Sequence, residues 1–532
     1  MFLQRALLTL LVALIASICA PKPATGQKKN VLFIAVDDLR PELGTYGIDF
    51  VNSPNIDKLA SQSMVFERAY CQVALCSPSR TSLLTGRRPD TNHVWEIAGD
   101  EYWRTFTNAT TIPQYFKENG YISAGMGKIF HPGAPNGNDD RAYSWSVPYF
   151  HAPGDSANGT SWHSFDTDDS NLQDGKIASY AISTLKEIKQ NRSKGDNRPF
   201  FVAVGFHKPH LPFFCAKKYY DLYPPPEQIA PPKNPDVPKD FPPIARGLGA
   251  IGRYVDTKQF FPNWTRCHSD VQASFDRDGC GVPEDYAKVL RKAYYSCVSH
   301  ADAQVGKVVA AMESMGFADD TIIVFWADHG WQLGEHNHWC KMTNFEDATR
   351  VPFMLKVPGV TDKGMRTKAL VELIDIFPTL TELVGLPVPP LCPADHNTKQ
   401  PLVCVEGTSL TPLLQDPNQQ WKKAAFSQYP RPNTGMTVIP NEPPFNHNEH
   451  GENVMGYSIR VDQYRFTEWY RFNRTTATPN FTDIWGTELY NHTEPTVFFN
   501  DENINMANQS DMKGLVESLR KMLHAGWRAA LP

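Results

Sequence analysis

The sequence lacks a marked excess of charge of either sign, because 52 Lys and Arg residues stand against 57 Asp and Glu residues. The resulting net charge of −5 provides no broad basic surface, so nucleic acid is not an expected partner. Internal repeats are also missing. An apolar content of 41% with 12% aromatic residues excludes a disordered chain. At 532 residues the chain exceeds one hydrophobic core, so a large domain and a smaller one are expected.

Long apolar runs are scarce, and the single candidate lies at the N-terminus. Arg5 precedes an apolar run over residues 6–20 whose end is rich in small residues, which is the layout of a signal peptide. We assign residues 1–25 to this signal, since the run is short for a membrane helix and has no amphipathic period for a core helix. No other segment is apolar enough to span a bilayer, so we expect a secretory protein without a membrane span.

Sequons and cysteines agree with a secretory route. Eight Asn-x-Ser/Thr sites are present, at Asn108, Asn158, Asn191, Asn263, Asn473, Asn480, Asn491 and Asn508. Among ten cysteines, the favoured disulfides are the two that close short loops, Cys392 with Cys404 and Cys267 with Cys280. The sequence leaves the pairing of the other cysteines open.

Three apolar runs without polar alternation define the larger part of the chain, at residues 30–36, 200–205 and 321–327. Such runs are typical of strands buried on both faces. Helical patterns lie between them, at residues 55–66, 112–119, 175–189 and 286–315. This alternation predicts an α/β fold with a large, mostly parallel sheet flanked by helices over residues 26–415.

The C-terminal residues, 416–532, show a different pattern of apolar residues. Short runs rich in aromatic and β-branched residues are separated by turn residues, at 424–429, 455–460, 464–469 and 488–490. A helical pattern follows at residues 512–525. We therefore predict a smaller subdomain with an antiparallel sheet and one helix.

Acidic residues follow two of the buried strands. Asp37 and Asp38 end the first run, and Asp328 with His329 ends the third. Adjacent carboxylates are costly to keep charged without a cation, although an aspartate in a turn or helix cap is a common alternative. Ligands of open α/β sheets gather at the carboxyl ends of strands, and carboxylate oxygens favour a hard ion such as Ca²⁺.

A second cluster begins at Cys76, in the segment Cys76-Ser-Pro-Ser-Arg80. Pro78 and the pattern that follows predict a helix, which would place Cys76 at an anion-binding helix N-terminus. A buried structural cysteine is the alternative.

Cys-x-Pro-Ser-Arg followed by Leu-Thr-Gly-Arg resembles the signature of the sulfatase family, and residues 76–87 match it. Further segments in the right order extend the resemblance over nearly the whole mature chain, at residues 36–41, 112–121, 127–133, 207–212, 328–336, 427–432 and 455–460. The resemblance implies an alkaline-phosphatase-like sulfatase fold. It also implies that a formylglycine-generating enzyme oxidises Cys76 to formylglycine.

The resemblance assigns residues to three roles. One calcium ion would be held by Asp37, Asp38, Cys76, Asp328 and His329. The catalytic groups would be Cys76, Arg80, Lys128, His131, His207 and Lys341. The sulfated sugar would be bound by Lys128, His131, His207, Trp331 and Lys341.

The chemistry of the modified residue explains this set. An aldehyde hydrate carries two hydroxyls on one carbon, of which one attacks sulfur and the other later expels sulfate. Cations stabilise charge on the sulfate oxygens, and His207 or His131 is expected to protonate the leaving sugar oxygen.

The sequence predicts the substrate less closely than it predicts the fold and the class of reaction. The segments resemble most the family branch that removes the 2-O-sulfate of iduronate in heparan sulfate and dermatan sulfate, and Arg460 or Arg465 could bind the uronate carboxylate. A sulfatase of other sugar specificity and an inactive glycan-binding homologue are the alternatives. The resemblance implies a lysosomal enzyme, with secretion from the cell as the alternative.

Overall fold

The structure is a computed structural model that describes residues 28–97, 101–246, 251, 254–260, 282–394, 403–431, 453–492 and 502–532. The predicted signal peptide and the Cys267–Cys280 pair lie outside the described residues. Among the helices of the described part, none is both long enough and apolar enough to cross a membrane.

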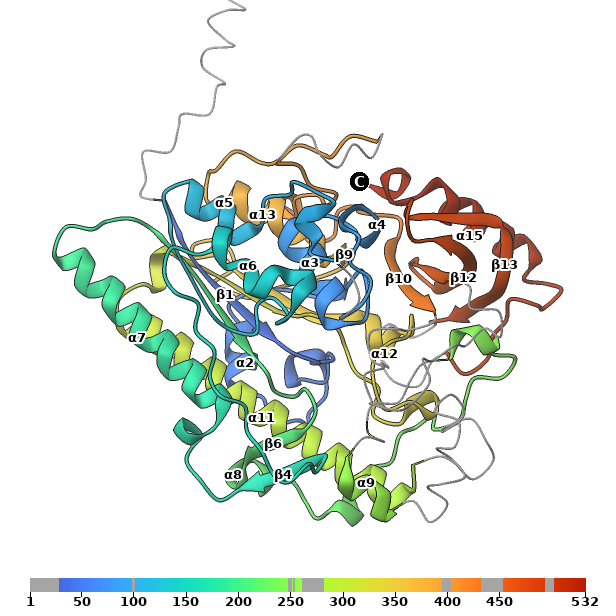
Figure 1. The fold of residues 1–532 in the computed structure, drawn as a ribbon, viewed down its shortest axis with the longest axis horizontal. Helices are drawn as coiled ribbons and strands as arrows, with labels where there is room; N and C mark the ends of the chain where they lie inside the picture. The colour runs from blue at the N-terminus through green and yellow to red at the C-terminus, as the bar shows by residue number, and fades with distance from the viewer. Residues whose placement is uncertain are drawn as a thin grey trace, which may run out of the picture.

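A seven-stranded sheet forms the centre of the larger part of the molecule, in the order β3-β5-β1-β7-β8-β2-β9 (Figure 1). Its strands in chain order are β1 Asn30–Val36, β2 Met64–Tyr70, β3 Ile122–Gly127, β5 Phe200–Phe206, β7 Thr321–Ala327, β8 Arg350–Lys356 and β9 Met365–Glu372. Only β8 runs antiparallel to its neighbours in this sheet. Every residue of β1, β5 and β7 is buried, which is why these strands show no polar alternation.

Helices cover both faces of this sheet. Figure 1 shows α3, α5 and α13 on one side and α2, α7 and α11 on the other. The helix bounds are α2 Pro54–Ala60, α3 Cys76–Thr85, α4 Pro89–Asn92, α5 Ile112–Glu118, α6 Gly137–Ser144, α7 Gln173–Ser193, α8 Lys217–Tyr220, α9 Val255–Phe260, α11 Glu284–Ser314, α12 Glu346–Thr349, α13 Ile376–Leu383, α14 Thr411–Gln415 and α15 Lys513–Ala525. A short parallel pair, β4 Trp162–Phe165 with β6 Phe213–Ala216, lies outside the main sheet. The predicted α/β class is confirmed.

One predicted helix is wrong in its second half. The pattern at residues 55–66 predicts a single helix, but α2 ends at Ala60 and β2 begins at Met64. Met64 and Phe66 are fully buried between β8 and β9, so sheet pairing decides the conformation of this segment.

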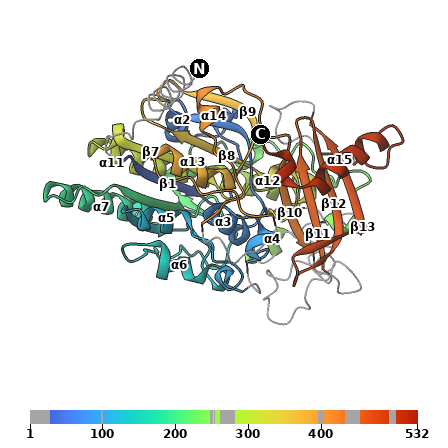
Figure 2. The same cartoon turned by 90° about the horizontal axis from the view of Figure 1, so that it is seen from above.

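The smaller sheet consists of β10 Ala425–Arg431, β11 Val454–Arg460, β12 Tyr464–Asn473 and β13 Thr478–Asn491. All three pairings are antiparallel, as predicted. Figure 2 shows the four strands side by side with α15 packed against them, and Leu519 and Leu523 of that helix share a core with Ile459 and Phe466. The division of the chain between residues 415 and 416 stays a prediction.

The Cys392–Cys404 disulfide is present, with an S–S distance of 1.98 Å, which confirms that prediction. The other cysteines of the described part are buried: Cys71, Cys76, Cys215, Cys297 and Cys340.

A buried carboxyl in the smaller sheet predicts a pH-dependent stability. Glu488 accepts hydrogen bonds from Trp469 Nε1 and Tyr490 Oη, each at 2.8 Å, yet burial raises its pKa to about 7. The folded state therefore binds more protons than the unfolded state between about pH 4.5 and 7, so stability falls as pH rises through that window. We expect urea unfolding to give about 2–3 kcal/mol more stability near pH 5 than near pH 7.5 from this group.

The matched comparison is Glu488→Gln, which keeps one acceptor and cannot ionise. The difference between the two pH values should shrink by that amount in the variant. An unchanged pH dependence would contradict the assignment to Glu488.

Candidate active site

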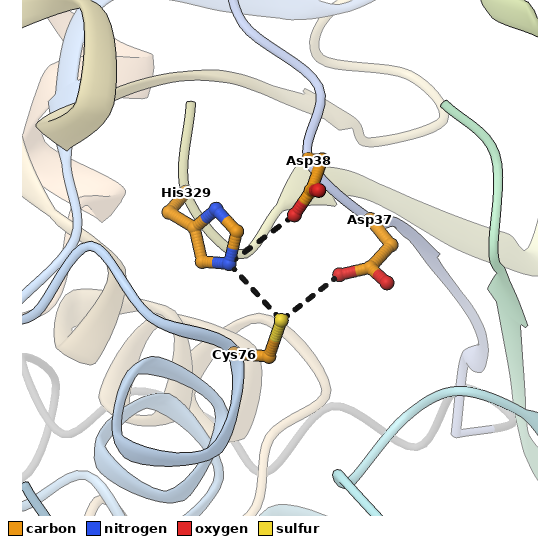
Figure 3. Close-up of side chains that lie close together, drawn as sticks. All are labelled: Asp37, Asp38, Cys76 and His329. Carbon is orange, nitrogen blue, oxygen red and sulfur yellow. Dashed lines mark hydrogen bonds and ion pairs between the residues drawn. The ribbon is translucent and has the colours of Figure 1, made fainter. Parts of the chain in front are cut away.

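Three chain segments converge at the carboxyl edge of the large sheet. Val36 of β1 lies opposite Ala327 of β7 in the parallel register, so the residues that follow each strand leave the sheet at the same level. Cys76 is the first residue of α3 and faces them. Figure 3 shows the side chains of Asp37, Asp38 and His329 around the thiol of Cys76. The predicted convergence of strand ends is therefore present.

The thiol of Cys76 is fully buried and contacts ionisable groups on several sides. Its Sγ lies 3.2 Å from His329 Nε2, 3.5 Å from Asp37 Oδ1 and 3.5 Å from Lys128 Nζ. Burial, reinforced by the negative charge of Asp37, raises the pKa of the thiol well above its ordinary value. As an unmodified cysteine this side chain is thus a poor nucleophile at neutral or acidic pH.

Arg80 lies one turn along α3 and is fully buried. Its Nε donates to Asp328 Oδ2 at 2.8 Å and its Nη2 donates to Asp37 Oδ1 at 3.1 Å. Its Nη1 donates to the backbone carbonyls of Lys128 and Ile129. One guanidinium therefore ties the ends of β1 and β7 to the segment after β3.

Two lysines complete the charge balance. Lys341 Nζ lies 2.7 Å from Asp38 Oδ1, and Lys128 Nζ forms an ion pair with Asp37 Oδ2. Burial alone would raise the pKa of Asp37, but Lys128 and the other cations around it outweigh burial and hold it well below its ordinary value. Burial would lower the pKa of Lys341, and Asp38 more than reverses this. Both lysines are nearly fully buried, so each remains a charged group inside the site.

The acidic cluster has room for one more cation. Asp38 Oδ2 is buried and has no hydrogen-bond partner among the described residues, and burial raises the pKa of Asp38 despite Lys341. Ligand atoms of Asp37, Asp38, Cys76 and His329 all lie within 4.8 Å of one another. Asp328 lies beside this group, with Oδ2 3.4 Å from His329 Nε2. The donor set fits a divalent metal ion, since an unpaired buried carboxylate oxygen is otherwise costly.

Three histidines border the cluster: His131, His207 and His210. His131 and His207, both predicted, are partly buried, and burial together with the charge of Lys128 lowers the pKa of His131 to about 3 and that of His207 well below its usual range. The imidazoles are therefore neutral before an anion enters. A sulfate between them would add negative charge, which favours the protonated form needed to donate a proton.

The sequence interpretation missed His210. Its Nε2 lies 4.0 Å from Asp38 Oδ2, and about a third of its side chain is exposed. The available signal was the repeat of His207 as His210 around Pro209, directly after a buried strand.

Trp331 stands behind Lys341 and is 1% exposed. Its ring centroid lies 5.0 Å from Lys341 Nζ, and its ring forms an edge-to-face pair with that of Phe213. The ring thus supports the lysine, and a contact with the sugar stays a prediction.

Arg460 and Arg465 cannot serve as the proposed carboxylate-binding residues. Both are almost fully buried, and both pair with Glu346, at 3.1 Å and 2.6 Å. Arg465 also pairs with Glu502. Their charges are therefore used inside the protein.

Asp174, in the first turn of α7, positions the histidine loop. Its two carboxylate oxygens accept the backbone N–H groups of His207 at 2.8 Å and Lys208 at 2.9 Å. Asp174→Asn can accept only one of these bonds, so we expect kcat to fall about ten- to hundredfold as His207 shifts. Steady-state kinetics on an aryl sulfate provides the measurement. Asp168→Asn, an exposed helix-cap change nearby, should leave kcat near the wild-type value, and equal effects of the two variants would contradict the positioning role.

The fold and this site define a family. The sulfatase family model matches residues 29–386, and a model of the N-sulphoglucosamine sulphohydrolase C-terminal region matches residues 334–441. The chain belongs to the sulfatase family.

Individual proteins within the family are similar to this chain over most of its length. The chain is 39% identical to iduronate 2-sulfatase of Mus musculus, over 92% of this chain and 93% of that protein. It is 38% identical to iduronate 2-sulfatase of Homo sapiens, over 88% of this chain and 90% of that protein. A solved structure of a 2-O GAG sulfatase superposes with a TM-score of 0.64 at 20% identity, covering 94% of this chain and 91% of that one. The last likeness supports the fold alone.

Family membership fixes the class of enzyme. The protein is a sulfatase, a sulfuric ester hydrolase, and sulfatases use a formylglycine residue and a divalent metal ion. Cys76 and the cluster around it stand where such chemistry would take place.

Proposed function

We propose that the protein removes the 2-O-sulfate of iduronate residues in heparan sulfate and dermatan sulfate. The observation that carries this proposal is the 39% identity to iduronate 2-sulfatase across nearly the full length of both chains. The pocket chemistry supports it, because two buried lysines and neighbouring imidazoles can surround a sulfate group.

The ion in this proposal is one Ca²⁺. Asp37, Asp38, Asp328 and His329 would hold it together with the modified Cys76 side chain. Conversion of the cysteine replaces sulfur by oxygen, which makes the ligand set suit a hard cation. Bound there, the ion would supply positive charge that lowers the pKa of a neighbouring hydroxyl.

The remaining groups act on the substrate in this proposal. Arg80 and Lys128 hold the modified side chain, and Lys128 with Lys341 stabilises charge on the sulfate oxygens. His207 or His131 donates a proton to the leaving sugar oxygen, because an alkoxide is a poor leaving group. His210 joins this set on the basis of its place beside Asp38.

Maturation and location follow from the same proposal. A formylglycine-generating enzyme would convert Cys76 in the secretory pathway. The finished enzyme would reach the lysosome, with secretion from the cell as the alternative.

The test is hydrolysis of defined disaccharides by protein made in cells with a formylglycine-generating enzyme. The proposal expects release of sulfate from a 2-O-sulfated iduronate disaccharide, and kcat/KM at least about a hundredfold lower for a 6-O-sulfated glucosamine disaccharide. Reversed preference would establish a different sugar specificity. Binding of both sugars without hydrolysis would establish a glycan-binding homologue.

A further inference from the structure

We propose that a cavity of about 360 Å³ next to the active site is a second carbohydrate-binding site, which takes an anionic sugar ring of the substrate glycan. The cavity lies where the larger part of the molecule meets the C-terminal sheet. Figures 1 and 2 both show α4 beside β10 at this junction. Its walls come from the segments around these elements, from β13, and from the end of α15 with the residues after it.

An unpartnered amide points to a ligand with hydroxyl groups. Gln72 lines the cavity and is 1% exposed, yet within the described part of the chain neither its Oε1 nor its Nε2 has a hydrogen-bond partner. Leaving both polar atoms of a buried amide unsatisfied is costly. A sugar hydroxyl can donate to one of these atoms and accept from the other, so a sugar ring satisfies both.

Aromatic rings supply the apolar part of the lining. Phe426, Tyr457 and Trp527 are partly buried there, and Phe481 is 41% exposed at the rim. Aromatic faces carry partial negative charge and attract the C–H groups of a pyranose ring. The mixture of aromatic faces with few polar groups is typical of small-molecule sites, and the volume lies in their range.

The charge of the lining favours an anionic sugar. The Arg88 guanidinium lies 5.6 Å from the Phe426 ring and 5.0 Å from the Trp527 ring, and its Nη2 donates to Glu372 at 2.9 Å. Arg528 lies 4.3 Å over Trp527. The carboxylate in the wall, Asp90, already accepts hydrogen bonds from three side chains. Arg88 keeps Glu372 as its ion-pair partner, whereas Arg528 donates to the backbone carbonyls of Cys392 and Pro393. Sulfate or carboxylate groups on a sugar would therefore meet the positive charge of Arg528.

One wall residue of the cavity is close to the reaction centre along the chain. Gln72 precedes Cys76 by four residues, so their Cα atoms are at most roughly 14 Å apart. A glycan of a few rings spans that distance. The inference rests on the proposed function for the identity of the ligand, and it adds that affinity depends on the length of the glycan.

The test compares a 2-O-sulfated disaccharide with a heparan sulfate hexasaccharide that carries the same terminal group. Phe481→Ala should raise KM about three- to tenfold for the hexasaccharide and leave KM for the disaccharide and both kcat values unchanged. Phe50→Ala, a similarly exposed phenylalanine remote in sequence from the cavity lining, is the matched control and should change neither substrate. Equal effects of Phe481→Ala on both substrates, or no effect on either, would overturn the proposal.

A second variant separates binding from folding. Gln72→Leu removes the unsatisfied amide, so thermal unfolding should show unchanged or higher Tm while KM for the hexasaccharide rises. A fall in Tm with unchanged KM would mean that Gln72 is structural, and would count against the site.

One further measurement tests whether the cavity instead holds the protein's own glycan. Another tests the site if the protein hydrolyses neither substrate. The alternative occupant is a glycan attached to Asn480 of the same chain. In that case Asn480→Gln and Phe481→Ala would lower Tm equally, and neither variant would change KM for the hexasaccharide. That result would overturn the proposal. If neither glycan is hydrolysed, the proposed function fails, and calorimetric binding of the hexasaccharide to wild type and Phe481→Ala decides the site alone. Weaker binding by the variant supports the site, and equal binding overturns it.

Discussion

Replacing Cys76 with alanine is expected to reduce kcat/KM for sulfate ester hydrolysis by at least roughly 10⁴-fold. The alanine has no side-chain atom that can be oxidised to an aldehyde, so the nucleophile is lost. The fold should survive, because the substitution removes one buried atom and leaves Arg80 in contact with Asp37 and Asp328. The measurement is hydrolysis of an aryl sulfate together with thermal unfolding.

Cys71→Ala is the matched control. Cys71 is also a fully buried free thiol, five residues earlier, and its Sγ has a carbonyl contact at Ala348. We expect this variant to keep activity within a fewfold of wild type. Activity of Cys76→Ala above about one hundredth of wild type would remove Cys76 from the reaction.

Asp38→Asn is expected to abolish binding of the divalent metal ion. Its Oδ2 is a buried carboxylate oxygen that accepts no hydrogen bond from the residues that the structure describes, and its Oδ1 pairs with Lys341 at 2.7 Å. The amide removes the negative charge and leaves Lys341 without its ion-pair partner. We expect purified wild type to carry about one Ca²⁺ per chain by mass spectrometry of metals, and the variant to carry less than about a tenth of that.

Thermal unfolding supplies an independent readout. Added Ca²⁺ should raise the Tm of chelator-treated wild type, as expected for a ligand that binds only the folded state, and should leave the Tm of Asp38→Asn unchanged. Asp302→Asn is the control for a buried aspartate outside the site, bonded to Asn55 and Ile56. Metal loss in both variants, or retention of metal by Asp38→Asn, would contradict a metal site at this cluster.

The central strands were predictable because burial on both faces leaves its mark in a single run of residues. Apart from Asn30 and Thr321 at their first positions, β1, β5 and β7 consist of apolar residues and glycine, without the polar positions that a half-exposed element needs. β2 was not predictable in this way. It contains Glu67 and Arg68, and its pairing with β8 and β9 comes from residues about 300 positions later.

The residues of the site also differ in whether the sequence alone could predict them. The convergence of Asp37, Asp38 and Asp328 could be predicted because strand ends have a local signature. The role of Cys76 was predicted from the resemblance of residues 76–87 to the sulfatase signature. Asp174 could not be predicted, since an aspartate in the first turn of a helix is common and its partners lie 33 and 34 residues away. Gln72 carries no local signal at all, because its significance is the missing partner that only the packed structure reveals.

The state of Cys76 tests the central claim most directly. Trypsin releases residues 69–80 as one peptide, which contains both Cys71 and Cys76. In protein made with a formylglycine-generating enzyme, we expect fragment masses to place a loss of about 18 Da at Cys76 and none at Cys71. An intact thiol at Cys76, with a second sulfatase converted in the same cells, would contradict the account.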